Sequence, residues 1–183
     1  MKKKTKVIIL IPISIISLMI IIFGVYLLVH RQRTAAHFEV NSPELEKKML
    51  IATQGSAFKD AVVAAVVKEV GSRPIYIKVI DVSKLDGVEE DRWDAVVLIH
   101  TTEAWKLQPD VERFLSRAKD PGRVILVTTS GSGEWKADDF DVDTITSASR
   151  PAEQEPVAAA IVGRLSTLVD NTLPAQIFNK FPE

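Results

Sequence analysis

The chain contains no cysteine, which excludes disulfide bonds, thiolate metal sites and cysteine nucleophiles. It has only three histidines, and two of them, His30 and His37, lie within one short segment. A multi-histidine metal centre is therefore not expected. The formal net charge is −1, and the acidic residues are concentrated after Asn41, so a nucleic acid is not an expected partner either.

Charged residues are also absent from residues 7–29, which read VIILIPISIISLMIIIFGVYLLV. The hydrocarbon core of a bilayer is about 30 Å thick, and roughly 20 apolar helical residues cross it. The run therefore predicts a single-pass transmembrane helix that serves as an uncleaved signal-anchor in a cell membrane. A cleaved signal peptide is the alternative, but its apolar core is usually about 7–15 residues long.

The residues that flank this run indicate its orientation. The tail of residues 1–6 carries four lysines, whereas Arg31 and Arg33 follow the run. Basic residues are more frequent on the cytoplasmic side of a span, so the bias favours a cytoplasmic N-terminus and an extracytoplasmic domain. The difference is two residues, and the cytoplasmic side stays open as the alternative.

The rest of the chain alternates between strand-like and helix-like segments. We expect a juxtamembrane linker over 30–47, one folded domain over 48–170 and a tail over 171–183. Unbroken apolar strands are typical of a parallel sheet that is covered by helices on both faces, so the predicted fold is a doubly wound α/β domain with five parallel strands. The predicted strands are 49–52, 75–82, 95–99, 124–127 and 142–146, and the predicted helices are 56–70, 109–118 and 156–169.

The connection over 128–141 departs from this alternation. A crossover between parallel strands normally takes a dozen or more residues and includes a helix. This segment is rich in Gly, Ser and Asp, so we expect a loop in place of the helix. Its aspartates (Asp138, Asp139, Asp141 and Asp143) suit either a calcium site or a solvated acidic loop, and their spacing does not match an EF-hand.

In open parallel sheets, ligands bind beyond the carboxyl ends of the strands. The first loop there, residues 53–57, leads into a helix whose N-terminus attracts anions. Thr53 and Ser56 could add hydroxyl donors, although Ser56 could equally just cap the helix. His100 and Glu103 suggest either acid–base chemistry or, for His100, a structural position at a strand end.

Two tryptophans, Trp105 and Trp135, follow separate strands at this predicted edge. Aromatic faces there could enclose a flat ring, pack over the edge of the sheet or contact a partner protein. No residue of the sequence is predicted to be catalytic.

The domain resembles the flavodoxin family over residues 48–169, through its alternating strands and helices, its Gly/Ser/Thr loop before the first helix and its two aromatic loops. The resemblance implies the strand order 2-1-3-4-5 and an FMN phosphate site in the first loop. Alignment on Gly55 matches Ala61 to a family alanine, while Ala52, Gln54 and Ala57 stand where the family has hydroxyl residues. The implied FMN-binding residues are Thr53, Gln54, Gly55, Ser56, Ala57, Thr102, Trp105, Thr129, Ser130, Gly131 and Trp135.

Two functions follow as hypotheses. The first is a membrane-anchored interaction module with a degenerate flavin site, which docks a membrane protein through the loops around Trp105 and Trp135. The second is an FMN-binding electron carrier or small flavin-dependent oxidoreductase with a redox partner at the membrane.

Overall fold

The computed structural model describes residues 13–25 and 34–170. The chain divides into two units, residues 1–32 and 33–183, and each is described by itself. In the first unit, residues 13–25 are helical. Within the described ranges, no helix combines the length and the apolar character needed to cross a bilayer. The remaining residues of the predicted span 7–29 lie outside these ranges, as do the tails over 1–6 and 171–183.

The second unit is built on a six-stranded sheet with the order β1-β3-β2-β4-β5-β6. β1 runs antiparallel to β3, and every other neighbouring pair is parallel. The strand bounds are β1 Phe38–Val40, β2 Lys47–Thr53, β3 Ile75–Asp81, β4 Ala95–Thr101, β5 Val124–Thr129 and β6 Asp143–Ser147.

The prediction of five strands in an all-parallel sheet is wrong, and the strand order differs because β1 adds an antiparallel strand at one edge. β1 lies inside the segment predicted to be a linker. A three-residue strand leaves almost no periodic signal in a sequence, and its conformation depends on pairing with β3. The five parallel strands keep the arrangement β3-β2-β4-β5-β6.

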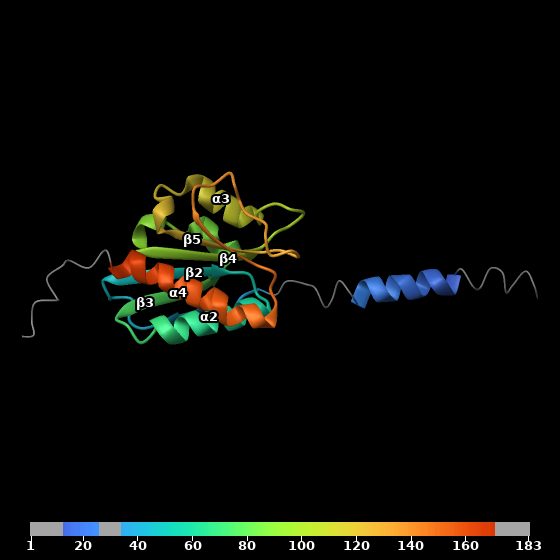
Figure 1. The fold of residues 1–183 in the computed structure, drawn as a ribbon, viewed down its shortest axis with the longest axis horizontal. Coiled ribbons are helices and arrows are strands. Elements are labelled where there is room, and N and C mark those ends of the chain that lie inside the picture. Colours follow the sequence, from blue (N-terminus) through green and yellow to red (C-terminus); the bar gives the residue numbers. More distant parts are fainter. Residues whose placement is uncertain (1–12, 26–33, 171–183) are drawn as a thin grey trace, which may run out of the picture. The chain divides into compact units, whose positions relative to one another are not determined.

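Within residues 34–170, the α-helices α2, α3 and α4 cover the sheet (Figure 1). α2 (Ala57–Val70) and α4 (Gln154–Asp170) lie side by side on one face. α3 (Pro109–Arg117) lies on the other face, next to the 3₁₀ turn η1 (Val82–Gly87). The other 3₁₀ turns are η2 Glu90–Arg92, η3 Pro121–Arg123 and η4 Pro151–Glu153.

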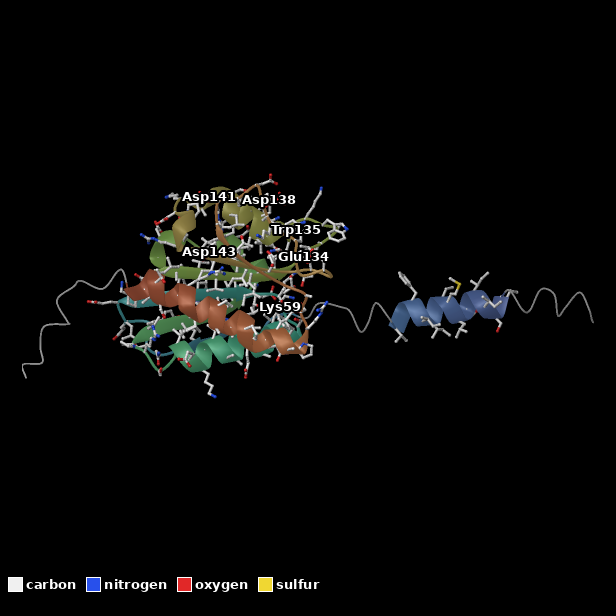
Figure 2. The ribbon with its side chains drawn as sticks, viewed as in Figure 1. Lys59, Glu134, Trp135, Asp138, Asp141 and Asp143 are labelled. Atoms are coloured by element: carbon white, nitrogen blue, oxygen red, sulfur yellow. The ribbon has the colours of Figure 1, made fainter. Side chains whose placement is uncertain are left out.

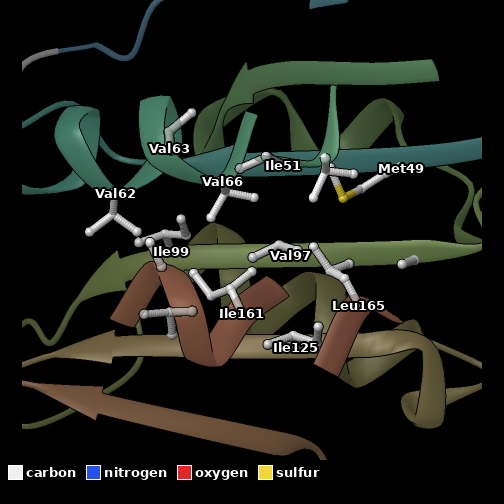
Figure 3. Close-up of a cluster of buried hydrophobic side chains, with 14 of the residues drawn as sticks. Met49, Ile51, Val62, Val63, Val66, Val97, Ile99, Ile125, Ile161 and Leu165 are labelled. Carbon is white, nitrogen blue, oxygen red and sulfur yellow. The ribbon is translucent and has the colours of Figure 1, made fainter. Parts of the chain in front are cut away.

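Successive strand residues point to opposite faces, so the sheet separates two hydrophobic clusters. The larger cluster lies between the sheet and the α2–α4 pair (Figure 3). Met49 and Ile51 of β2 belong to it, whereas the intervening Leu50 belongs to the smaller cluster together with Phe114 of α3. Burial of both faces explains why the central strands read as unbroken apolar runs.

The predicted loop in place of a crossover helix is confirmed, because the described segment 130–142 between β5 and β6 contains no helix. Apolar side chains of this segment pack against the smaller hydrophobic cluster in place of a helix. Ala137 is buried in the smaller cluster, and Trp135, Phe140 and Val142 pack against that cluster. The connection from β3 to β4 is likewise made of 3₁₀ turns in place of an α-helix.

The chain enters this unit at the carboxyl edge of the sheet. The Ala35 N–H donates to Asp81 Oδ2 at 2.7 Å, at the end of β3. The chain then runs back along β3 and turns at Asn41, whose φ of 66° is left-handed. The Asn41 side-chain amide donates to the carbonyls of Gly71, Arg73 and Ile75 at 3.1, 3.1 and 2.8 Å.

Asn41→Ala should destabilise residues 33–183 by about 1–3 kcal/mol, because it removes these hydrogen bonds and places a Cβ-bearing residue without a polar side chain at positive φ. Urea denaturation measures the free energy of unfolding. Asn41→Gly is the matched control, because glycine accepts positive φ without the steric cost. An Asn41→Ala domain as stable as the unmodified one would contradict the role given to this turn.

Candidate functional site

The parallel strands reverse their order between β2 and β4, so the loops after these strands meet at the switch point where ligands bind in open α/β sheets. Gln54 occupies this point and is only 7% exposed. Its Oε1 accepts a hydrogen bond from the Thr101 N–H at 2.6 Å, and its Nε2 donates to Glu103 Oε1 at 3.5 Å. Its own N–H donates to the Ile99 carbonyl at 3.0 Å. The chain therefore bridges its switch point with its own hydrogen bonds.

The hydroxyls of the first loop already have partners. Ser56 caps α2, and its Oγ accepts from the Lys59 N–H at 3.3 Å, as in the capping alternative. The Thr53 hydroxyl is buried and donates to the Gln54 carbonyl at 3.2 Å. Gly55 is buried, and Ala57 is exposed at the start of the helix. A ligand at this loop would have to compete with the Gln54 carbonyl for the Thr53 proton, whereas the Ser56 hydroxyl keeps its own proton to donate.

Lys59 is a residue of this edge that the sequence reasoning missed (Figure 2). It lies in the first turn of α2 and is only 2% exposed. Its Nζ donates to Thr101 Oγ1 at 2.6 Å, and Thr101 Oγ1 lies 2.9 Å from Thr129 Oγ1. Because the Thr129 hydroxyl donates to the His100 carbonyl, at 3.0 Å, the Thr101 hydroxyl is the donor in the threonine pair. One directional chain of hydrogen bonds thus joins α2, β4 and β5.

The Lys59 ammonium is buried without a counter-ion among the described carboxylates. It also lies at the positive end of the α2 dipole, which disfavours a cation. Burial lowers its pKa to about 8, while the neighbouring Asp60 acts in the opposite direction. A sequence signal did exist, because Lys59 continues the stripe of Val62, Val63 and Val66 that faces the core.

His100 is fully buried at the end of β4, and its two ring nitrogens have partners. Nδ1 lies 3.1 Å from the Thr101 carbonyl and Nε2 lies 3.1 Å from Thr128 Oγ1. A carbonyl can only accept, so Nδ1 carries the proton and Nε2 accepts from the threonine. Burial lowers the His100 pKa to about 4, which keeps the ring neutral. His100 therefore occupies the structural position, while Glu103 lies on an exposed turn.

The two tryptophans have different surroundings. Trp135 is half-buried and packs against the smaller cluster. Trp105 is 71% exposed on a tight turn that is closed by two 3.0 Å backbone hydrogen bonds between Glu103 and Lys106. Both central residues of the turn, Ala104 and Trp105, have positive φ, at 49° and 64°. Such conformations cost roughly 1–3 kcal/mol each in non-glycine residues and persist only where the surrounding structure imposes them.

Backbone hydrogen bonds hold the loops after β4 and β5 to the ends of the neighbouring strands β5 and β6. The Thr102 N–H donates to the Thr129 carbonyl, and the Ser130 N–H donates to the Ser147 carbonyl, both at 3.0 Å. Ser130 Oγ accepts from the Gly133 N–H at 3.0 Å, and Gly131 is exposed at the tip. Gly133 has a φ of 78°, and a Cβ there would lie 2.7 Å from the Ala148 nitrogen. The loop is therefore held tightly, with glycine required at Gly133.

The acidic segment does not gather into a metal site within the described ranges, where no group of three or more His, Cys, Asp or Glu side chains is placed to hold an ion. Asp138 and Asp139 are exposed. Asp143 pairs with Arg164 of α4, with 2.9 Å between Oδ2 and Nε.

Lys59 should make stability depend on pH in alkaline solution. The unfolded chain holds this proton up to about pH 10.4, whereas the folded chain releases it near pH 8. Between these values the unfolded state binds more protons, so the free energy of unfolding should rise with pH from 8 to about 10. Above that, Tyr76 opposes the trend, because burial raises its pKa to about 12.

Urea denaturation of Lys59→Met across this pH range measures the effect. The rise should be lost in this variant and retained in Lys68→Met, which removes an exposed lysine from the same helix. An unchanged rise in Lys59→Met would contradict the assignment.

Three comparisons with known proteins complete the description. No protein-family model matches the chain, and no curated protein matches it. Solved structures similar to it include a flavodoxin from the domain Archaea (14% identity, covering 67% of this chain and 99% of that one, TM-score 0.47). Others are an oxidoreductase from Corynebacterium diphtheriae (14%, 71% and 100%, 0.46) and general stress protein 14 from Treponema denticola in complex with FMN (14%, 68% and 98%, 0.36).

Proposed function

We propose that this chain is a membrane-anchored binding module whose flavodoxin-like domain makes its contacts through the carboxyl edge of the sheet. The observation that carries the proposal is the Gln54 bridge between β2 and β4. The point at which a cofactor would enter such a sheet is already spanned by hydrogen bonds of the chain itself. The solvent-exposed aromatic side chain at this edge is Trp105.

The anchor in this proposal is residues 7–29, with the N-terminus in the cytoplasm and the domain on the extracytoplasmic side. Its support is the absence of charge over the run and the lysines that precede it. The partner is then a component of the same membrane. Retention of the full chain in the membrane pellet after alkaline carbonate extraction tests the anchor, and release into the supernatant would contradict it.

A second function, FMN binding for electron transfer, is favoured by one observation. The Lys59 ammonium is buried at the N-terminus of α2 without a counter-ion among the described residues, and a phosphate group beside it would compensate the charge. The N-terminus of α2 and Lys59 would hold the phosphate, and Trp105 would contact the ring. When bound, FMN would supply one- and two-electron redox chemistry.

The fit to FMN is incomplete in two respects. The Thr53 hydroxyl, which could have donated to a phosphate, already donates to the Gln54 carbonyl. Trp135, the second predicted ring contact, packs against the hydrophobic cluster. These contacts favour the binding module over the electron carrier.

Titration of residues 33–183 with FMN separates the two functions. We expect the flavin fluorescence to stay unchanged at micromolar protein, because the switch point is bridged and the Thr53 hydroxyl already donates within the chain. Quenching that is lost in the double variant Trp105→Ala and Trp135→Ala, with the domain still folded by circular dichroism, would replace the binding module by the electron carrier. Quenching that survives the double variant would place the flavin elsewhere.

A further inference from the structure

The way in which the chain enters the domain determines which edge of the sheet lies nearest to an anchor. Ala35 is 8% exposed and is hydrogen-bonded to Asp81 at the carboxyl end of β3. Only residues 30–34 separate it from the end of the apolar run. Five residues span at most roughly 18 Å even when fully extended.

The opposite edge lies farther from this point of entry. β3 is seven residues long and runs away from Asp81 toward Ile75. A strand of that length covers roughly 23 Å, so the amino edge is separated from the entry point by the full height of the sheet. The chain that precedes Ala35 therefore joins the domain at the carboxyl edge of the sheet and not at the amino edge.

The side chains at the carboxyl edge suit a lipid surface. Within residues 34–170, Phe38 and Trp105 are the exposed large hydrophobic residues, at 38% and 71%. Phe38 pairs with Val79 near the end of β3, and Trp105 follows β4. Indole rings are enriched at membrane interfaces, because an apolar ring and an N–H donor match the boundary between acyl chains and headgroups.

Exposed basic residues accompany this tryptophan. Lys106 is adjacent to it, Lys136 follows β5, and Arg150 follows β6 with 72% of its side chain exposed. The acidic residues Glu103 and Glu134 are exposed on the same loops, so the basic residues supply local contacts to phosphate headgroups without making the whole edge positive.

The turn that carries Trp105 keeps its side chain directed away from the core. Its two backbone hydrogen bonds fix the positive φ values of Ala104 and Trp105. The first residue after the turn, Leu107, is buried in the smaller cluster. Gln108 then caps α3 through its Oε1, which accepts from the Asp110 and Val111 N–H groups at 2.7 and 2.9 Å. The local fold therefore keeps the Trp105 side chain exposed to solvent.

We infer that the contact surface of the proposed binding module faces the bilayer and that Trp105 inserts at the headgroup level of the membrane to which the chain is anchored. This inference rests on the proposed anchor. It identifies the first partner of the carboxyl edge as a phospholipid surface.

The absence of cysteine from the chain makes a direct test available. The full chain carrying Lys106→Cys, labelled with an environment-sensitive nitrobenzoxadiazole, is reconstituted into vesicles of phosphatidylcholine and phosphatidylglycerol in equal parts. Lys119→Cys is the matched control, because it replaces an exposed lysine after α3, at the amino edge. The label at 106 should show blue-shifted emission that brominated acyl chains quench, and the label at 119 should show neither.

A third chain combines Lys106→Cys with Trp105→Ala and should show a reduced blue shift, because the inserted indole is lost. Flotation of the vesicles on a density gradient is measured for every chain. Chains that do not float would overturn the anchor, and this inference with it. If the chains float but the label at 106 is as exposed to water as the label at 119, this inference alone is overturned. Trp105 would then contact a protein partner.

Discussion

Both faces of the sheet are buried, and this constraint determines where the chain can carry chemistry. β2, β4 and β5 lie between two hydrophobic clusters, so their central side chains are almost entirely apolar. Polar groups are tolerated only where the strands end, and each must then find a hydrogen-bond partner. The hydrogen bonds of Gln54 and Thr101 and the Lys59–Thr101–Thr129 chain are the result at the carboxyl edge.

The same edge also holds a buried cation, Lys59, and an exposed aromatic side chain, Trp105, and the two groups favour different kinds of ligand. Lys59 lacks a counter-ion among the described residues, and burial lowers its pKa. A positive charge at this position favours an anion at the edge, whether a headgroup phosphate or a phosphorylated ligand. Trp105 favours an apolar contact at the same edge. The inferred phospholipid surface would supply both chemistries, whereas the bridged switch point leaves little access for a flat ring.

Much of this architecture could be predicted from the sequence, because the apolar runs of the parallel strands are strong local signals. The Ser56 cap and the loop in place of the last crossover helix were also readable. β1 was missed because Phe38–Val40 is short and depends on its pairing with β3. Lys59 was overlooked because a charged residue was not expected to continue the apolar stripe of α2. The packing of Trp135 against the smaller cluster depends on the three-dimensional path of an irregular loop, which no local pattern encodes.

The Thr101 amide reports whether the chain's own side chains close the switch point. Amide hydrogen exchange of residues 33–183, followed by NMR with and without FMN, measures this single N–H. We expect protection from exchange that is unchanged by FMN and lost in Gln54→Ala, since Gln54 Oε1 is the acceptor of the Thr101 N–H. Rapid exchange of Thr101 in the unmodified domain, or protection that FMN alters, would contradict this closure of the switch point.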